Sequence, residues 1–165
     1  MKLAFKIAGT DDVDDLVRLR NEVSQHLASL YGQGIWAGKA TTKATLFHMR
    51  TSNVFVARYR KRLIATFTLS TKKPWAIDRK YFTPCKRPLY LTAMAVHPVM
   101  QRKGIGRLCI EEALRFTRGW PADAIFLDAF DADAGAGEFY SRCGFREVGR
   151  ATYRIAPLIY YEMLV

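Results

Sequence analysis

The chain has 165 residues, half of them hydrophobic, which matches one domain with a sizeable core over residues 1–165. No apolar stretch approaches the roughly 20 residues of a membrane span, and Lys6 interrupts the N-terminus before an apolar region of signal-peptide length develops. The net charge of +11 should attract phosphorylated cofactors, acidic substrates or nucleic acid, and it does not choose among these anions.

The first third of the chain predicts one strand and two helices. Residues 3–7 alternate like a half-buried strand. Thr10-Asp11-Asp12 follows as a helix start, with a capping hydroxyl and acids at the positive end of the helix dipole. Apolar residues then recur at helical spacing, and we expect this helix to end before Tyr31. A second helix should begin near Thr41 or Thr42.

A strand hairpin and a long connection come next. The β-rich runs 53–59 and 63–69 are joined by Arg60-Lys61-Arg62, which is typical of a hairpin with a basic turn. Residues 72–88 are basic and aromatic, contain three prolines and exceed the common loop length. This segment is a candidate functional loop or a subunit contact of a homodimer. The alternative is a loop that packs only on its own domain.

The second half of the chain alternates strands and helices. We expect strands over 89–96, 124–130, 146–153 and 158–164, and helices over 105 to about 118 and over roughly 135–142. A strand, a helix and a further strand in this order predict a parallel βαβ unit. Gly144 is suited to a left-handed cap after the short helix.

The segment between the 89–96 strand and the next helix is the most informative one. It contains Gln101-Arg102-Lys103-Gly104-Ile105-Gly106-Arg107. A helix N-terminus offers unpaired N–H groups, and glycines remove the side chains that would hold a phosphate away. Three cations beside the same site strengthen an anion-binding interpretation. The spacing lacks the third glycine of a dinucleotide fingerprint and the Gly-Lys-Ser/Thr of a P-loop.

Two motifs together resemble the GNAT superfamily of N-acetyltransferases. The Gln101–Gly106 loop, after the strand end Val96-His97-Pro98, is similar to the family's Q/R-x-x-G-x-G/A acyl-CoA loop. The run Asp133–Phe145 resembles its second signature, N-x-x-A-x-x-F/L-Y-x-x-x-G-F. The resemblance covers residues 53–165 well. Asp133 stands where the family commonly has an asparagine that binds the cofactor arm.

The resemblance implies an α/β GNAT fold: a mixed, mostly antiparallel sheet of about seven strands, flanked by helices, with a splay between strands four and five. It further implies direct transfer of acetyl from acetyl-CoA to a primary amine, with no metal. The backbone of the fourth strand would bind the pantetheine arm and polarise the thioester carbonyl. The implied cofactor-binding residues are Met94, Ala95, Val96, Gln101, Arg102, Lys103, Gly104, Ile105, Gly106, Arg107 and Asp133.

Two side chains are candidates for proton transfer. Tyr140 matches the position where many family members use a tyrosine as general acid toward the CoA thiolate. The alternative is an aromatic side chain whose hydroxyl is merely satisfied. Asp128 interrupts the apolar fifth strand near its end, where the splay opens, and it is our first choice of base for the acceptor amine. Glu22 and Glu162 are alternatives that fit structural roles better.

Other classes of function stay open at this point. A basic nucleic-acid-binding module would fit the charge, although neither an RNP-like motif nor a recognition helix is present. A regulatory domain that binds CoA without catalysis would keep the loop. Cys85, Cys109 and Cys143 are odd in number and lack CxxC spacing, so neither a disulfide framework nor a zinc site is indicated. We expect reduced thiols in the cytoplasm, and an acceptor that these residues do not identify.

Overall fold

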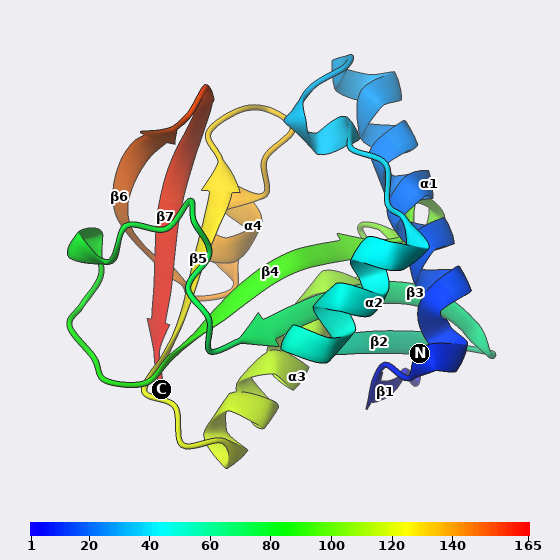
Figure 1. The fold of residues 1–165 in the computed structure, drawn as a ribbon, viewed down its shortest axis with the longest axis horizontal. Helices are drawn as coiled ribbons and strands as arrows, with labels where there is room; N and C mark the ends of the chain where they lie inside the picture. The colour runs from blue at the N-terminus through cyan, green and yellow to red at the C-terminus, as the bar shows by residue number, and fades with distance from the viewer.

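A seven-stranded sheet forms the centre of the computed structural model, which describes residues 1–165. The strands are β1 (Ala4–Ile7), β2 (Asn53–Tyr59), β3 (Arg62–Ser70), β4 (Pro88–Val96), β5 (Ala124–Phe130), β6 (Arg146–Tyr153) and β7 (Ala156–Leu164). Their spatial order is β1-β2-β3-β4-β5-β7-β6 (Figure 1). Only β4 and β5 pair in parallel. The predicted fold class, a mixed and mostly antiparallel sheet, is confirmed.

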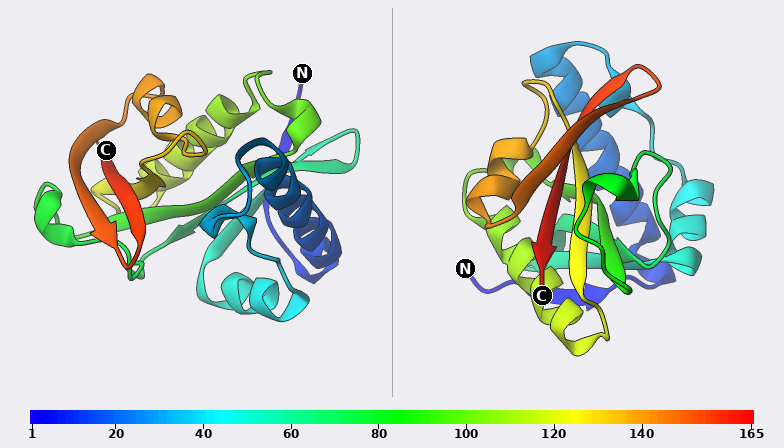
Figure 2. Two further views of the ribbon diagram at one scale, coloured as in Figure 1. Left: turned by 90° about the horizontal axis from the view of Figure 1, so that it is seen from above. Right: turned by 90° about the vertical axis from the view of Figure 1, so that its left-hand side faces the viewer.

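Four α-helices cover the two faces of the sheet. They are α1 (Val13–Tyr31), α2 (Thr42–Thr51), α3 (Ile105–Gly119) and α4 (Gly137–Arg142). Figure 2 shows α1 and α2 on one face and α3 and α4 on the other. The sequence did not predict the short 3₁₀ turn Ile35–Ala37 between α1 and α2. None of the helices has the length and apolar character that crossing a bilayer requires.

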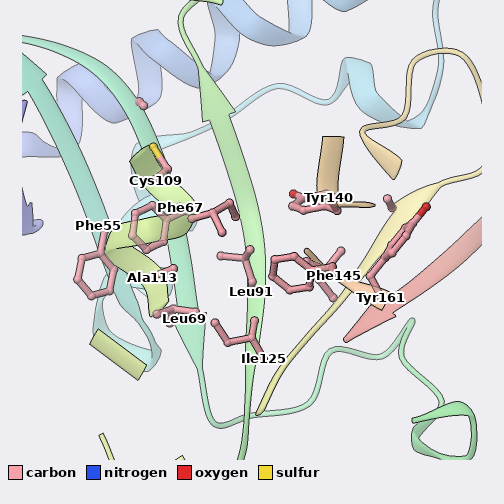
Figure 3. Close-up of a cluster of buried hydrophobic side chains, with 14 of the residues drawn as sticks. Phe55, Phe67, Leu69, Leu91, Cys109, Ala113, Ile125, Tyr140, Phe145 and Tyr161 are labelled. Atoms are coloured by element: carbon pink, nitrogen blue, oxygen red, sulfur yellow. The ribbon is translucent and has the colours of Figure 1, made fainter. Parts of the chain in front are cut away.

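Alternate residues of the central strands point to opposite faces of the sheet and pack into two separate cores. On the α3 and α4 side, Leu91, Ile125 and Leu127 join a cluster of 19 buried residues (Figure 3). On the opposite side, Tyr90 and Phe126 join a smaller cluster. This period of two is the geometry of a strand buried on both faces, so it explains why β5 is almost continuously apolar.

The segment 72–88 packs on the second of these cores. Ile77 and Phe82 are buried against β5 and β7, and the Tyr160 hydroxyl of β7 donates a hydrogen bond to the Ala76 carbonyl. The structure therefore supports the alternative in which this loop covers its own domain. A role in subunit contact stays a prediction. Trp75, which is 85% exposed, is the large apolar side chain of the loop that a second subunit could cover.

Asp12 links the first strand, the first helix and the β2–β3 hairpin. Its side chain is buried and accepts bonds from Lys6 Nζ at 2.7 Å, Arg58 Nη2 at 2.8 Å and the Gly9 N–H at 2.9 Å. Burial alone would raise the pKa of Asp12, but these bonds outweigh it and lower the pKa to about 2. The predicted hydroxyl cap by Thr10 is wrong, because the Asp12 carboxylate closes this helix start instead.

Replacing Asp12 with asparagine should lower the free energy of unfolding by about 2 kcal/mol at neutral pH. The folded-state pKa lies below the unfolded value of 3.8, so this stabilisation is present above that value and is lost as pH falls toward about 2. Urea denaturation at several pH values measures it. Asp14→Asn, an exposed acid in the same helical turn, is the control. A deficit of constant size down to pH 2 would contradict the ion-pair explanation.

Candidate active site

The two parallel strands diverge and open the sheet at its centre. β4 and β5 pair only at Pro88–Ala124, Leu89–Ile125 and Tyr90–Phe126. Beyond these pairs β4 continues to Val96 and β5 to Phe130 without a shared ladder. Backbone groups on the facing edges therefore have no strand partner, and a ligand can use them. The predicted splay between strands four and five is confirmed.

A β-bulge in β4 sets which side chains face each side of this opening. Thr66 lies opposite Ala95 and Thr68 opposite Thr92, so two residues of β4, Ala93 and Met94, stand against one of β3. Ala93 adopts a left-handed φ of 52°. The extra residue reverses the alternation, and Met94 packs on the α3-side cluster together with Leu91.

The loop before α3 presents a row of backbone N–H groups. Arg102 and Gly104 both have left-handed backbones, with φ of 58° and 80°. None of the N–H groups of residues 102–107 donates to a backbone carbonyl, and the first helical bond runs from Leu108 N to Gly104 O. Such a turn leading into a helix N-terminus forms a concavity that suits a phosphate.

The side chains of this loop have different surroundings. Gln101 Nε2 donates to the Val96 carbonyl at 3.1 Å, which ties the loop to the end of β4. Arg107 Nη2 donates to the Arg142 carbonyl at 3.2 Å, so this guanidinium braces α4. Arg102 and Lys103 are exposed. The structure thus divides the three predicted cations into two at the open side of the loop and one in a structural contact.

The structure favours glycine at positions 104 and 106 of the loop for two different physical reasons. A Cβ on Gly106 would lie 2.9 Å from the Phe139 ring, so Gly106 allows α3 and α4 to approach closely. A Cβ on Gly104 would meet no protein atom within 4 Å, but the backbone there is left-handed. Gly106→Val would therefore disturb packing as well as any ligand, and Gly104 is the better position for testing the phosphate loop.

We expect Gly104→Ala to weaken acetyl-CoA binding about tenfold and to cost about 1 kcal/mol in stability through its left-handed backbone. Gly104→Asn should restore most of the stability, because asparagine tolerates this conformation, while its side chain still obstructs the phosphate approach. Calorimetry and thermal denaturation separate the two effects. Gly119→Ala, at the other end of α3, is the control. Wild-type affinity in Gly104→Asn would disprove the assignment of the loop.

Tyr140 reaches from α4 toward the opening. Its side chain is 8% exposed and packs among Phe139, Phe145 and Tyr161, and Figure 3 shows its ring between the diverging strands. The hydroxyl makes one weak contact, to Met94 Sδ at 3.9 Å. Burial, and secondarily the negative charge of Asp128, raises the pKa of Tyr140 well above its usual value. The phenol is thus a protonated donor without a strong partner.

Asp128 occupies the opposite side of the opening. In β5 it shares parity with Phe126 and Phe130, which pack on the second core, whereas Leu127 and Ala129 face the Tyr140 side. Burial raises the pKa of the Asp128 carboxyl. A group that can supply a proton and a group that can take one therefore flank the splay from its two sides.

The alternative bases are held in other networks. Glu162 is buried and accepts bonds from the Thr83 N–H and hydroxyl and from Arg146. Burial would raise the pKa of Glu162, but these bonds lower it. Glu22 Oε2 lies 2.7 Å from His97 Nε2, which also contacts Arg62 Nη2 at the start of β3. Asp133 is exposed in the turn before α4. The contacts of Glu22 and Glu162 thus favour structural roles for both glutamates.

Trp36 lies beside the opening and was not predicted from the sequence. Trp36, in the 3₁₀ turn between α1 and α2, places its ring 6.2 Å from that of Phe130 at the end of β5. Its Nε1–H donates to the Gly32 carbonyl at 3.2 Å, which fixes the ring. The only available signal was an isolated tryptophan among glycines, which does not reveal a contact more than 90 residues away in sequence.

Solved structures of acetyltransferases share this fold. The chain superposes on the ribosomal-protein-S18-alanine N-acetyltransferase of Escherichia coli with a TM-score of 0.73 and 14% identity, covering 99% of this chain and 94% of that one. PaiA N-acetyltransferase of Thermoplasma acidophilum, solved with coenzyme A, gives 0.75 and 14% over 99% and 100%. YncA of Salmonella typhimurium, solved with its cofactor acetyl-CoA, gives 0.72 and 15% over 99% and 94%.

The sequence itself also identifies the family. The model of the acetyltransferase (GNAT) family matches residues 20–145, which include the loop before α3, Asp128 and Tyr140. The chain therefore belongs to the GNAT acetyltransferase family, as the two motifs predicted. No curated protein matches the chain in sequence.

Proposed function

We propose that this protein transfers the acetyl group of acetyl-CoA directly to a primary amine, with both substrates bound at the splay. The observation that carries the proposal is the placement of Tyr140 and Asp128 on the two sides of the opening between β4 and β5. An acyl donor and an amine acceptor that enter from opposite faces meet at this gap, with a proton donor on one side and an acceptor on the other.

Acetyl-CoA would bind on the α3 and α4 side. Its pyrophosphate fits the free N–H groups of residues 102–107, and Arg102 and Lys103 would add charge-assisted bonds. The pantetheine arm would follow the unpaired edge of β4 at Met94, Ala95 and Val96. We retain Gln101 and Arg107 in the site as residues that hold the loop in place, and Asp133 as an exposed candidate contact to the arm.

The reaction then needs three contributions from this chain. A backbone N–H of β4 polarises the thioester carbonyl. Asp128, directly or through a water molecule, accepts the proton that the amine loses as its nitrogen bonds to the acyl carbon. When the C–S bond breaks, the Tyr140 hydroxyl gives a proton to the departing thiolate. One proton is taken and one is given, so the products are the amide and free CoA.

The acceptor would approach from the α1 and α2 side. Trp36 and the β6–β7 hairpin border this approach (Figure 1). The structurally similar Escherichia coli enzyme is named for its action on an alanine of ribosomal protein S18. Small amines and protein amines both remain in the proposal. The free cysteines fit a reducing compartment such as the cytoplasm.

A nucleic-acid-binding role is less well supported, because part of the basic hairpin is neutralised. Arg58 bonds both Asp12 and Asp15, each at 2.8 Å. We expect binding to DNA or RNA to be weak, unselective and lost near physiological salt. Fluorescence anisotropy at several salt concentrations tests this. A tight, sequence-selective complex that survives salt would favour the nucleic-acid module over the enzyme.

Thiol release from acetyl-CoA across a panel of amines tests the proposed function. We expect release that depends on at least one primary amine, with stoichiometric formation of its acetamide by mass spectrometry. Calorimetric binding of acetyl-CoA without turnover on small amines, peptides or basic proteins would instead identify a regulatory CoA-binding domain. Lack of acetyl-CoA binding would refute both.

A further inference from the structure

A polar cavity lies away from the splay, between α1, α2 and the segment that joins them. Its volume is about 270 Å³, and its polar lining is formed by Arg20, Ser24, Lys39, Thr41, Thr45 and His48. This lining contains three basic side chains and no acid. Figure 2 shows α1 and α2 on the face of the sheet opposite α3. The residues that line the cavity come from these two helices, the segment between them and β2.

Arg20 is the unusual member of this lining. Arg20 is half-buried, and its Nε, which is fully buried, has no hydrogen-bond partner in the protein. Burial lowers the pKa of Arg20. The neighbouring acids of α1 are engaged elsewhere, Asp15 with Arg18 and Arg58, and Glu22 with His97. Because the buried Nε–H of Arg20 has no acceptor and no carboxylate lines the cavity, a ligand that brings an anionic oxygen to it would be favoured.

The walls of the cavity are held in place before any ligand arrives. Asn21 exchanges two hydrogen bonds with the backbone of Ala40, and the Ser24 hydroxyl donates to the Gly38 carbonyl. Thr41 caps α2 by accepting from the Ala44 N–H, which leaves its own hydroxyl proton free. These bonds fix the walls of the cavity, and no carboxylate lines it.

We propose that this cavity binds an oxyanion, the phosphate or carboxylate group of a small ligand, with Arg20 as its main partner. The planar guanidinium matches both groups in a two-pronged geometry, and Lys39 and the Thr41 hydroxyl add further donors. The volume accommodates a small anion or the anionic end of a larger molecule. None of the cavity's lining residues belongs to β4, β5 or the loop before α3.

The Nε–Hε signal of Arg20 in an ¹⁵N spectrum of the wild-type protein tests the proposal without any substitution. We expect inorganic phosphate or malonate to move this signal saturably, while sodium chloride at equal ionic strength does not. Response to one of the two narrows the ligand to phosphoryl or carboxylate compounds. Coenzyme A should move the amides of Gly104 and Gly106 and leave the Arg20 signal unchanged. No response to either anion, or an equal response to coenzyme A, would overturn the separate site.

Matched variants provide the second test. Arg20→Gln should weaken the affinity for the anion at least about tenfold, whereas Arg50→Gln, an exposed arginine of α2, should leave it nearly unchanged. In phosphate-free buffer Arg20→Gln should melt no lower than wild type, because it removes an uncompensated charge. Phosphate should raise the melting temperature of wild type and Arg50→Gln but not of Arg20→Gln. Equal increases in all three proteins would show that Arg20 has no such role.

Discussion

Tyr140→Phe should lower turnover about 10²-fold while the affinity for acetyl-CoA stays nearly unchanged. The substitution removes one hydroxyl and keeps the ring that packs against Phe145 and Tyr161. That hydroxyl makes only a 3.9 Å contact to Met94 Sδ, so little stability should be lost. Because the pKa of Tyr140 is raised, the phenol stays protonated across the neutral range, and the deficit should not change with pH.

Steady-state kinetics on an accepted amine and calorimetry with acetyl-CoA measure these two quantities. Tyr161→Phe is a matched control, because it removes a hydroxyl from the same buried cluster. We expect the control to keep nearly all of its activity. Full activity of Tyr140→Phe would show that the thiolate leaves without this acid, and a parallel loss in both variants would point to packing instead.

Asp128→Asn should lower turnover by about 10² to 10⁴-fold near neutral pH, the range for loss of a general base. The deficit should shrink as pH rises, because a growing fraction of the amine is already neutral. In the wild type the carboxylate form is needed, and burial raises the pKa of Asp128, so activity should fall as pH drops through that raised pKa. The pH profiles of the two proteins therefore converge on the alkaline side.

Stability provides an independent check on Asp128. A carboxyl with a raised folded-state pKa stabilises the folded protein at low pH, and this contribution is lost as pH rises. Asp128→Asn should therefore be at least as stable as wild type at neutral pH by urea denaturation. Asp131→Asn, an exposed acid paired with Arg150 just beyond β5, is the control for activity. A destabilised Asp128→Asn protein would indicate a structural carboxylate.

The sequence predicted most of the architecture because the relevant signals are local. The β5 strand and the β6 strand have the predicted ends, and the α3 helix differs by one residue at its C-terminus. The β5 strand is an almost continuous apolar run between two aspartates, β6 follows Gly144, and α3 has a helical pattern between Gly104 and Gly119. The start of α1 was assigned to the wrong cap, because it is the Asp12 carboxylate that accepts from the Gly9 N–H. The cations that hold this carboxylate, Lys6 of β1 and Arg58 of β2, are brought to it only by the folded sheet.

The site was predictable in its motif and unpredictable in its geometry. The glycines and Tyr140 lie in local signatures, so their positions followed from residue order. The bulge at Ala93 has no such signal, because alanine rarely adopts a left-handed backbone and only pairing with β3 reveals the extra residue. Without it, strict alternation would have placed Met94 on the wrong side of the sheet. Trp36 and Arg20 likewise acquire meaning only from distant parts of the chain.

The placement of Tyr140 and Asp128 on two faces has a consequence for how the reactants come and go. If acetyl-CoA and the amine enter from opposite faces of the sheet, as proposed, either molecule could leave while the other is still bound. Initial-rate lines at several fixed concentrations of the second reactant should then intersect instead of running parallel. Compounds that join an amine to the thiol of CoA through a short tether would then occupy both binding positions at once, one on each face of the sheet.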